Sequence, residues 1–328
     1  MKQIYNFPIL GNITVNIDNV PLSNFVKRQM KNYFMSESNT ASGSTYIEYA
    51  SRINSEKLKR FMNKYDRLGR QISVTDSGID LDTYSYIIND DTIIIRKKNE
   101  KPAWYKALKK IYYITFGNTE DKQYASLHSM YYEYILFPLL SLFALSDGYY
   151  CLHGSLLDIN NRYMIISGLD GVGKSSISNY IELSGKGRLL ADNIVLFNGK
   201  YAVPFNCAMR LPKDITLSHE ILYTSKEFME VLPPSVIFEK CMVDKIFTLS
   251  VSRDDFHINT VDYSLSQLIL FLNNAPEINR ANKTVSVLAY INSLTDDSYE
   301  NSIVNKFYDL AIPLGKIEEA MEVLLNEC

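Results

Sequence analysis

Cysteine and tryptophan are scarce in this sequence, and the cysteines follow no regular spacing. The 328 residues include 1 Trp and 4 Cys. Zinc sites and disulfide-stabilised small folds use closely spaced cysteines such as a C-x-x-C pair, which this sequence does not contain. We therefore expect reduced thiols in a cytoplasmic protein. The cysteines are Cys151, Cys207, Cys241 and Cys328.

Excess charge and long apolar runs are also lacking. The 34 basic and 37 acidic residues leave a net charge of −3, which argues against a nucleic-acid partner bound on a basic face. Residues 1–18 lack the apolar core and the cleavage site of a signal peptide. The most apolar stretch, 131–146, is shorter than the roughly 20 residues of a membrane span and contains Glu133 and Pro138. We expect it to be a buried helix and the protein to have no membrane partner.

The length and the remaining composition are those of a two-domain globular chain. Hydrophobic residues make up 46% and charged residues 22% of it, with 24 tyrosines, and domains average ~150 residues. We place the boundary near residue 120. We expect residues 1–120 to form a small α+β domain for recognition or scaffolding, and residues 121–328 to form a larger α/β domain. The polar segment 116–126 is the expected linker.

Hydrophobic periodicity gives a coarse map of the elements. In the first domain the expected helices are 21–34 and 55–65, and the expected strands are 45–50, 84–89 and 92–98, the last two forming a hairpin. In the second domain the expected helices are 126–146 and 315–328, and the expected strands are 188–192, 193–197 and 245–251. Residues 149–168 predict a hairpin with an Asn160-Asn161 turn that leads into a glycine-rich loop.

Residues 168–175, GLDGVGKS, match the phosphate-loop pattern G-x-x-x-x-G-K-[ST] at every position. An apolar strand precedes them and a helix-compatible stretch follows, as that pattern requires. Glycines let backbone N–H groups surround a phosphate, and the helix adds its positive end. Lys174 is expected to hold the β- and γ-phosphates, and Ser175 to coordinate Mg²⁺. The expected nucleotide-binding residues are Gly168, Asp170, Gly171, Val172, Gly173, Lys174, Ser175 and Ser176.

Two further residues stand near this loop in the sequence. Asp192 ends the apolar strand 188–192, and only a short helix and a turn separate it from the loop. We expect its strand beside the phosphate-loop strand and its carboxylate near the γ-phosphate, where it suits a general base. The alternative is a turn or N-cap aspartate. His153 begins the hairpin, and it is either an active-site histidine or a buried structural one.

The order of these motifs resembles one known family. The run LHGSLLDINNRYMIISGLDGVGKSS, followed by GRLLADN, is similar to the catalytic core of the HPr kinase family. The resemblance covers about residues 126–212. It implies a mixed-sheet phosphate-loop kinase domain with a phosphoenolpyruvate-carboxykinase-like nucleotide fold. It also implies ATP and Mg²⁺ as cofactors, Asp192 as general base and His153 near the transferring phosphate. Self-association is a tendency of the family, and the oligomeric state stays open.

The sequence departs from that family at two places. Asn193 stands where the family has a second, metal-binding Asp, so the resemblance makes Ser175, Asp192 and Asn193 the metal ligands. The family's acidic, glycine-containing signature is missing, and YAVPFNCAMRLP stands in its place. The better match is to divergent relatives in peptide-modification gene clusters, of the lasso-peptide kinase type. By analogy with them, Arg210 is a candidate phosphate or acceptor contact, with an ordinary surface arginine as the alternative.

These observations favour a kinase that phosphorylates a hydroxyl, with Ser of a peptide or small protein as the expected acceptor. The expected catalytic residues are Asp192, His153, Lys174 and Arg210. No motif identifies the nucleobase, so GTP and ADP stand as alternatives to ATP. Because Asn193 is neutral, a nucleotide-binding regulator with little transfer activity is a second hypothesis. An HPr kinase/phosphorylase is a third.

Overall fold

The computed structural model describes the parts of the chain that form three sheets and the helices packed on them. The described residues are 1–7, 10–17, 19–38, 46–50, 73–75, 78–80, 84–89, 92–97, 120–136, 139, 149–169, 171–204, 208–212, 220–224, 228–232, 239–253, 256–261, 307–313 and 316–326.

The chain divides into two compact units, Met1–Ser146 and Asp147–Cys328. This boundary differs from the one expected near residue 120, because helix α4 (Glu120–Tyr131) packs within the first unit. The Phe25 ring of helix α1 contacts the rings of Tyr124 and Tyr131 on α4. Part of the expected linker, 116–126, is therefore the first turns of a packed helix, which continues into a π-helical turn, η2 (Tyr132–Leu136).

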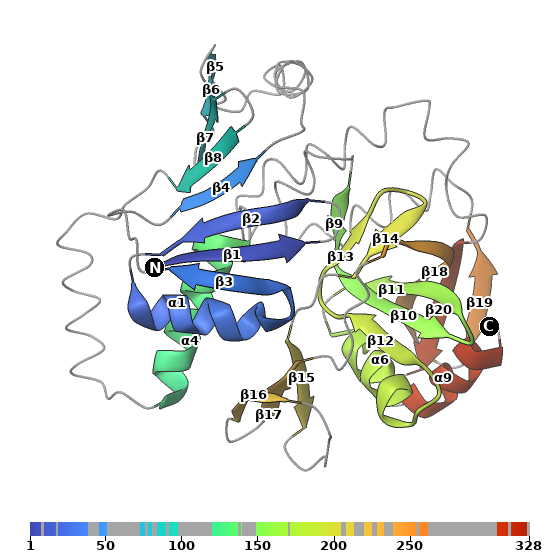
Figure 1. Ribbon diagram of the computed structural model, residues 1–328. Coiled ribbons are helices and arrows are strands. Elements are labelled where there is room, and N and C mark those ends of the chain that lie inside the picture. Colours follow the sequence, from blue (N-terminus) through green and yellow to red (C-terminus); the bar gives the residue numbers. More distant parts are fainter. Residues whose placement is uncertain are drawn as a thin grey trace. The chain divides into compact units, whose positions relative to one another are not determined.

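The first unit contains an eight-stranded antiparallel sheet in the order β3-β1-β2-β4-β8-β7-β6-β5 (Figure 1). The expected strands 45–50, 84–89 and 92–98 are confirmed over 46–50, 84–89 and 92–97, as is the hairpin that joins the last two. The expected helix 55–65 lies outside the described residues. The strands are β1 (Lys2–Phe7), β2 (Gly11–Asn16), β3 (Phe34–Ser38), β4 (Tyr46–Ala50), β5 (Ser73–Thr75), β6 (Gly78–Asp80), β7 (Tyr84–Asn89) and β8 (Thr92–Lys97).

Helix α1 (Val20–Gln29) is shorter than the helix expected over 21–34. It starts at an Asn19 cap, whose side chain accepts a hydrogen bond from the backbone N–H of Leu22 at 2.9 Å. After it ends, a 3₁₀ turn, η1 (Lys31–Tyr33), leads directly into β3. The apolar residues near position 34 that suggested helix therefore belong to an edge strand.

The second unit contains a nine-stranded mixed sheet, which confirms the expected mixed α/β architecture. Its main path is β12-β10-β11-β18-β14-β13-β9, with β20 paired to β18 and β19 to β20. Strands β11, β18 and β20 are parallel, whereas β10 is antiparallel to both β11 and β12. The strands are β9 (Tyr150–Leu152), β10 (Gly154–Ile159), β11 (Arg162–Gly168), β12 (Arg188–Ala191), β13 (Val195–Phe197), β14 (Tyr201–Val203), β18 (Cys241–Ser252), β19 (His257–Thr260) and β20 (Phe307–Pro313).

Two helices and a small sheet complete this unit. Helices α6 (Lys174–Leu183) and α9 (Ile317–Asn326) pack against each other and on the same face of the large sheet (Figure 1). Ile177 and Ile181 of α6 join the apolar cluster of that face. A separate sheet in the order β15-β17-β16 adds Met209 and Met229 to the same cluster. Its strands are β15 (Met209–Pro212), β16 (Ile221–Thr224) and β17 (Phe228–Val231).

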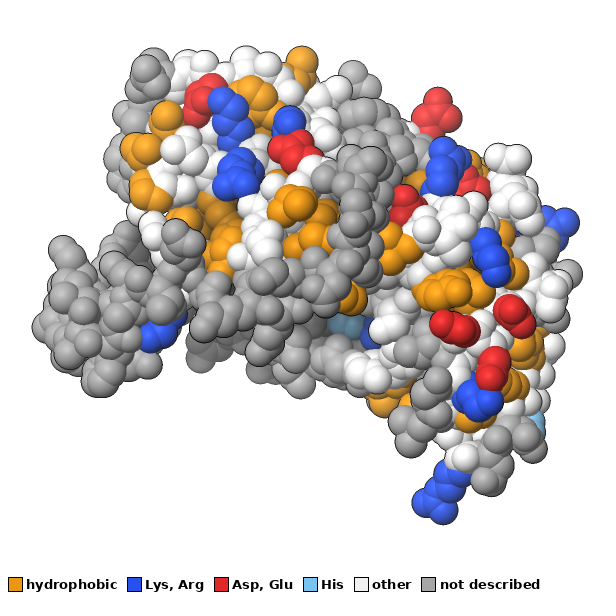
Figure 2. Space-filling view, turned by 90° about the horizontal axis from the view of Figure 1, so that it is seen from below, with side chains coloured by type: hydrophobic (Ala, Val, Ile, Leu, Met, Phe, Trp, Pro, Cys, Tyr) orange, Lys and Arg blue, Asp and Glu red, His pale blue; other side chains and the backbone are white. Residues whose placement is uncertain are grey.

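Three further observations concern membrane-spanning helices, a cysteine and the charges on the surface. Among the described residues, no helix is long and apolar enough to span a membrane. Cys241 is a free, buried thiol, and its burial raises its pKa to about 11, so it is neutral at neutral pH. Figure 2 shows acidic and basic side chains interspersed over the face in view, so neither sign dominates there.

Candidate functional site

The glycine-rich segment joins strand β11 to helix α6, as the sequence predicts. Gly168, Gly171 and Gly173 have φ values of +153°, +82° and +98°, which L side chains rarely adopt. At Gly168 space is lacking too, because a Cβ there would lie 2.9 Å from the carbonyl oxygen of Leu249. This strand–loop–helix arrangement presents backbone N–H groups and the positive end of a ten-residue helix to one place, where an anion can bind.

The side chain of Lys174 bonds back to the start of the loop. Its Nζ donates hydrogen bonds of 2.8 Å to the carbonyl oxygens of Gly168 and Leu169, and the residue is 7% exposed. The ammonium group is therefore held over the loop by the two residues at which the loop begins. A phosphate placed against the loop would meet this positive charge at short range.

Asp192 lies beside the hydroxyl of Ser175, the residue expected to coordinate Mg²⁺. Ser175 Oγ donates to Asp192 Oδ1 at 3.2 Å, and Ser155 Oγ donates to the same oxygen at 2.8 Å. Asp192 is 5% exposed. A buried carboxylate is costly without such donors, so the two hydroxyls account for its presence. No residue that the structure describes donates to Oδ2.

The strand of Asp192 does not lie beside the phosphate-loop strand, which corrects that expectation. The hairpin partner β10 occupies the edge of β11, and β12 adds to the far side of β10. Because β12 and β11 are both antiparallel to β10, they run in the same direction. Their carboxyl ends therefore meet the same edge of the sheet, and Asp192 reaches the loop across one intervening strand.

A β-bulge in β12 turns Asp192 toward helix α6. The pairing with β10 runs from Leu157 opposite Leu189 to Leu156 opposite Ala191, so Leu190 is an extra residue. Leu190 and Ala191 both join the apolar cluster on the sheet face away from α6. Uninterrupted alternation would have placed Asp192 on that face as well. The bulge reverses it, which is a common function of bulges near active sites.

Ser155 is a site residue that the sequence analysis did not single out. It is fully buried on β10, and the pair Leu156–Ala191 places it directly opposite Asp192 across the ladder. Its hydroxyl lies on the α6 face because Leu157, two residues on, belongs to the cluster around α6. In the sequence, Ser155 is marked only by its position directly after His153-Gly154. Its contact with Asp192 becomes apparent only from the pairing of β10 with β12.

His153 lies next to the phosphate-loop strand. The residue is 8% exposed and precedes β10, and its backbone oxygen accepts a 3.0 Å hydrogen bond from Ser167 Oγ at the end of β11. Gly154 follows because a Cβ there would lie 2.5 Å from the Ile166 carbonyl oxygen. The hydrogen bond from Ser167 holds the His153 backbone against the residue that precedes the loop, and the role of the His153 side chain toward a phosphate stays a prediction.

The remaining candidates lie in three different parts of this unit. Asn193 has a φ of +68° in the tight turn after β12, a conformation in which asparagine is enriched. Its side chain makes no hydrogen bond within the described part of the chain. Arg210 lies in the separate sheet, on β15 directly opposite Glu230 of β17. Val172, Gly171 and Ser176 lie on the loop and the first turn of α6. Asp170 is outside the described residues.

The donor set at the loop fits Mg²⁺ bound together with phosphates. Magnesium prefers oxygen ligands and is held in proteins by one or two carboxylates or hydroxyls, with the substrate's phosphates completing its shell. Ser175 Oγ and the Asp192 carboxylate are oxygen donors in contact with each other. Among the described residues, no group of three or more His, Cys, Asp and Glu converges on a metal site.

Comparisons with known proteins do not identify a family for this chain. No family model matches the chain, and no curated protein matches it. Among solved structures, the HPr(Ser) kinase/phosphatase of Coxiella burnetii aligns over 54% of this chain and 94% of its own, at 13% identity and a TM-score of 0.28. A likeness at that TM-score carries no argument about fold or function.

Proposed function

We propose that this chain is an ATP-dependent phosphotransferase that phosphorylates a hydroxyl group, with Ser of a peptide or small protein as acceptor. The observation that carries the proposal is the contact between Ser175 Oγ and Asp192 Oδ1 at 3.2 Å, at the mouth of a phosphate loop. It brings together a candidate magnesium ligand and a buried carboxylate that keeps one oxygen available. A phosphate loop alone would support nucleotide binding and no more.

In the proposed in-line transfer, each part of the site has its own role. The loop N–H groups and Lys174 hold the triphosphate, and Asp192 Oδ2 accepts the proton of the acceptor hydroxyl. The acceptor oxygen then forms a bond to the γ-phosphorus while the bond from that phosphorus to the β–γ bridging oxygen breaks. The products are the phosphorylated acceptor and ADP. When bound, Mg²⁺ would neutralise charge on the β- and γ-phosphates, with Ser175 Oγ as its protein ligand and Asp192 accepting a hydrogen bond from that hydroxyl.

Asp192→Asn tests the proposed proton acceptor. The purified chain is incubated with Mg-ATP and a library of Ser-containing peptides, and phosphopeptides are measured by mass spectrometry. We expect the variant to lose transfer by about 10³-fold, because general-base catalysis contributes about 10²–10⁴-fold. Measured without Mg²⁺, its affinity for a non-hydrolysable ATP analogue should stay within about threefold of that of the unaltered chain, because the loop and Lys174 rather than Asp192 hold the phosphates.

The matched control is Glu322→Gln on α9, an exposed carboxylate of the same unit. This variant should transfer phosphate at the original rate. Near-normal transfer by Asp192→Asn would show that Asp192 is not the base. Failure of the unaltered chain to phosphorylate any peptide would remove the peptide kinase from consideration.

A nucleotide-binding regulator is the second candidate, and Asn193 favours it. The neutral side chain removes one anionic ligand that the kinases it resembles direct at the metal. Under this alternative, the chain binds Mg-ATP but does not consume it when acceptors are added. ATP consumption that depends on both Mg²⁺ and acceptor therefore separates the two candidates.

A further inference from the structure

We infer that Ser155 is a positioning residue that fixes Asp192 for proton acceptance, an inference that rests on the proposed transferase function. The basis is a hydrogen bond between two buried side chains, Ser155 Oγ to Asp192 Oδ1 at 2.8 Å. Nothing in the phosphate-loop pattern requires a hydroxyl at this place.

Ser155 is the more rigidly held of the two donors to Asp192. It lies within β10, which is hydrogen-bonded to β11 on one side and to β12 on the other. Ser175 is exposed, lies in the first turn of α6 and donates across a longer distance of 3.2 Å. When Ser175 Oγ becomes a metal ligand, its position is set by the metal as well as by Asp192. Ser155 is then the donor to Asp192 whose position is determined by the sheet alone.

Both donors bond to the same carboxylate oxygen of Asp192, so the two oxygens have different roles. Oδ1 is occupied, whereas Oδ2 accepts from none of the residues that the structure describes. A carboxylate held through a single oxygen cannot exchange its two oxygens by rotating without breaking the Ser155 bond. Ser155 therefore keeps the same oxygen directed at the acceptor.

The bulge at Leu190 and the hydroxyl of Ser155 together determine where the Asp192 side chain lies. The bulge turns Asp192 to the α6 face, and this places its side chain opposite Ser155 rather than in the apolar cluster on the other face. Without a hydroxyl at position 155, the turned carboxylate would face the buried strand β10 with no donor from the sheet. The two features are useful only together.

The test compares Ser155→Ala with Ser178→Ala. Ser178 is also fully buried, on α6 in the same unit, and its Oγ has no hydrogen-bond partner within the described part of the chain. Each variant removes one buried hydroxyl, but only the first removes a donor to Asp192. We expect Ser155→Ala to lower kcat about tenfold or more, the loss expected for a hydrogen bond to a charged group. Its KM for Mg-ATP should stay within about threefold.

Ser178→Ala should leave kcat unchanged, and Ser155→Thr, which keeps the hydroxyl, should recover most of the activity. Equal kcat for Ser155→Ala and the unaltered chain would overturn the inference. A loss that appears in the KM for Mg-ATP rather than in kcat would also overturn it, because Ser155 would then serve binding. Should Ser155→Thr fail to fold, the comparison of the two alanine variants still decides. If the unaltered chain has no turnover, the proposed transferase function fails and this inference fails with it.

Discussion

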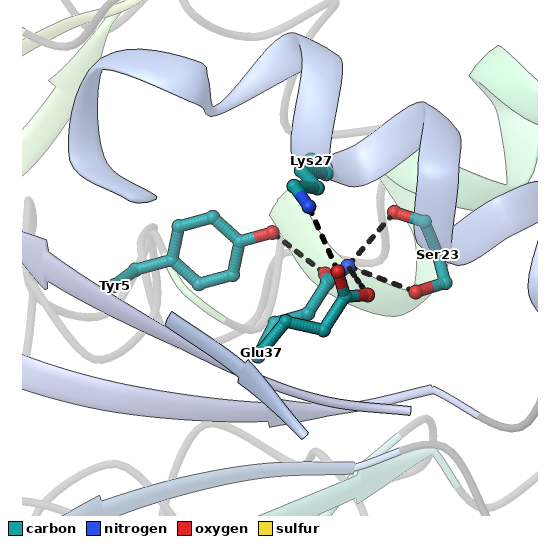
Figure 3. A network of polar contacts seen from close by, with 5 residues as sticks. Tyr5, Ser23, Lys27 and Glu37 are labelled. Carbon is teal, nitrogen blue, oxygen red and sulfur yellow. Dashed lines mark hydrogen bonds and ion pairs between the residues drawn. The ribbon is translucent and has the colours of Figure 1, made fainter. Parts of the chain in front are cut away.

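Two carboxylates, one in each unit, are held in opposite ways. In the first unit, both oxygens of Glu37 are engaged, Oε1 by Gln3 Nε2 at 3.1 Å and Oε2 by Lys27 Nζ at 2.8 Å (Figure 3). In the second unit, Asp192 accepts two hydroxyls on Oδ1 and none from the described residues on Oδ2. Each carboxylate accepts two hydrogen bonds, but only Asp192 has an oxygen that accepts none from the described residues, and a substrate hydroxyl can donate to that oxygen.

The surroundings of Glu37 extend this contrast. Gln3, which is fully buried, also donates to the hydroxyl of Ser23 at 2.8 Å and accepts from Tyr5 at 2.7 Å (Figure 3). Burial raises the pKa of Tyr5, so its phenol remains a donor. The network links β1, β3 and α1, and its contacts are those of a structural fastener. The difference teaches that an acceptor oxygen without a donor, rather than the number of polar groups in a network, indicates a functional site.

Lys174→Ala should give the largest effect among variants that sharpen this contrast. Lys174 bonds to loop carbonyls, and removing it takes a cation away from the place where phosphates bind. We expect the Kd for a non-hydrolysable ATP analogue to rise about 30- to 150-fold, since a hydrogen bond to a charged group is worth about 2–3 kcal/mol. Calorimetric titration measures it.

Lys27→Ala is the matched control, because Lys27 pairs with Glu37 in the first unit. It should leave the nucleotide Kd unchanged. An equal weakening by both lysine variants would mean that general charge, rather than the loop, drives nucleotide binding.

Gln3→Leu should have the next largest effect, on stability alone. Leucine cannot replace the amide, so the buried groups of Ser23 and Tyr5 lose partners at the same time. Each unsatisfied buried group costs about 1–3 kcal/mol, and we expect a loss of about 2–3 kcal/mol in the free energy of unfolding. Denaturant titration measures this loss. Tyr5→Phe, which removes only one donor, should lose about 1 kcal/mol. A drop in nucleotide affinity with Gln3→Leu would contradict a purely structural network.

The local parts of the site were predictable from the sequence, because local chemistry decides them. The Asn160-Asn161 turn has φ values of +54° and +63°, and asparagine tolerates that conformation. The phosphate-loop glycines lie in backbone regions that only glycine enters easily. In these segments neighbouring residues determine the conformation, so the sequence is sufficient.

The non-local parts were not predictable. The insertion of β10 between β11 and β12 is a choice among sheet orders, and the run RLLAD carries no mark of the bulge at Leu190. Ser155 acquires a role only through that pairing. The division after residue 146 differs from the boundary expected near residue 120 for a similar reason, because only packing of α4 on Phe25 assigns the helix to the first unit. Pairing and packing join residues far apart in the chain, and periodicity does not record them.

The smallest expected effect is the pH dependence contributed by Glu37. Hydrogen bonds from Lys27 and Gln3 hold the pKa of this carboxyl below its usual range. A group whose pKa is lower in the folded state stabilises the fold fully above its unfolded pKa of about 4.3, and the contribution disappears as pH falls through the folded pKa. Because the Glu37 side chain is partly exposed, we expect the contribution to be below about 1 kcal/mol. The difference in unfolding free energy between the unaltered chain and Glu37→Gln should therefore be constant from pH 7 to about pH 5 and shrink at lower pH. A difference that grew on acidification would mean that the two contacts do not favour the ionised form of Glu37. The comparison with Asp192, which rests on both Glu37 oxygens accepting hydrogen bonds as a carboxylate, would then not hold.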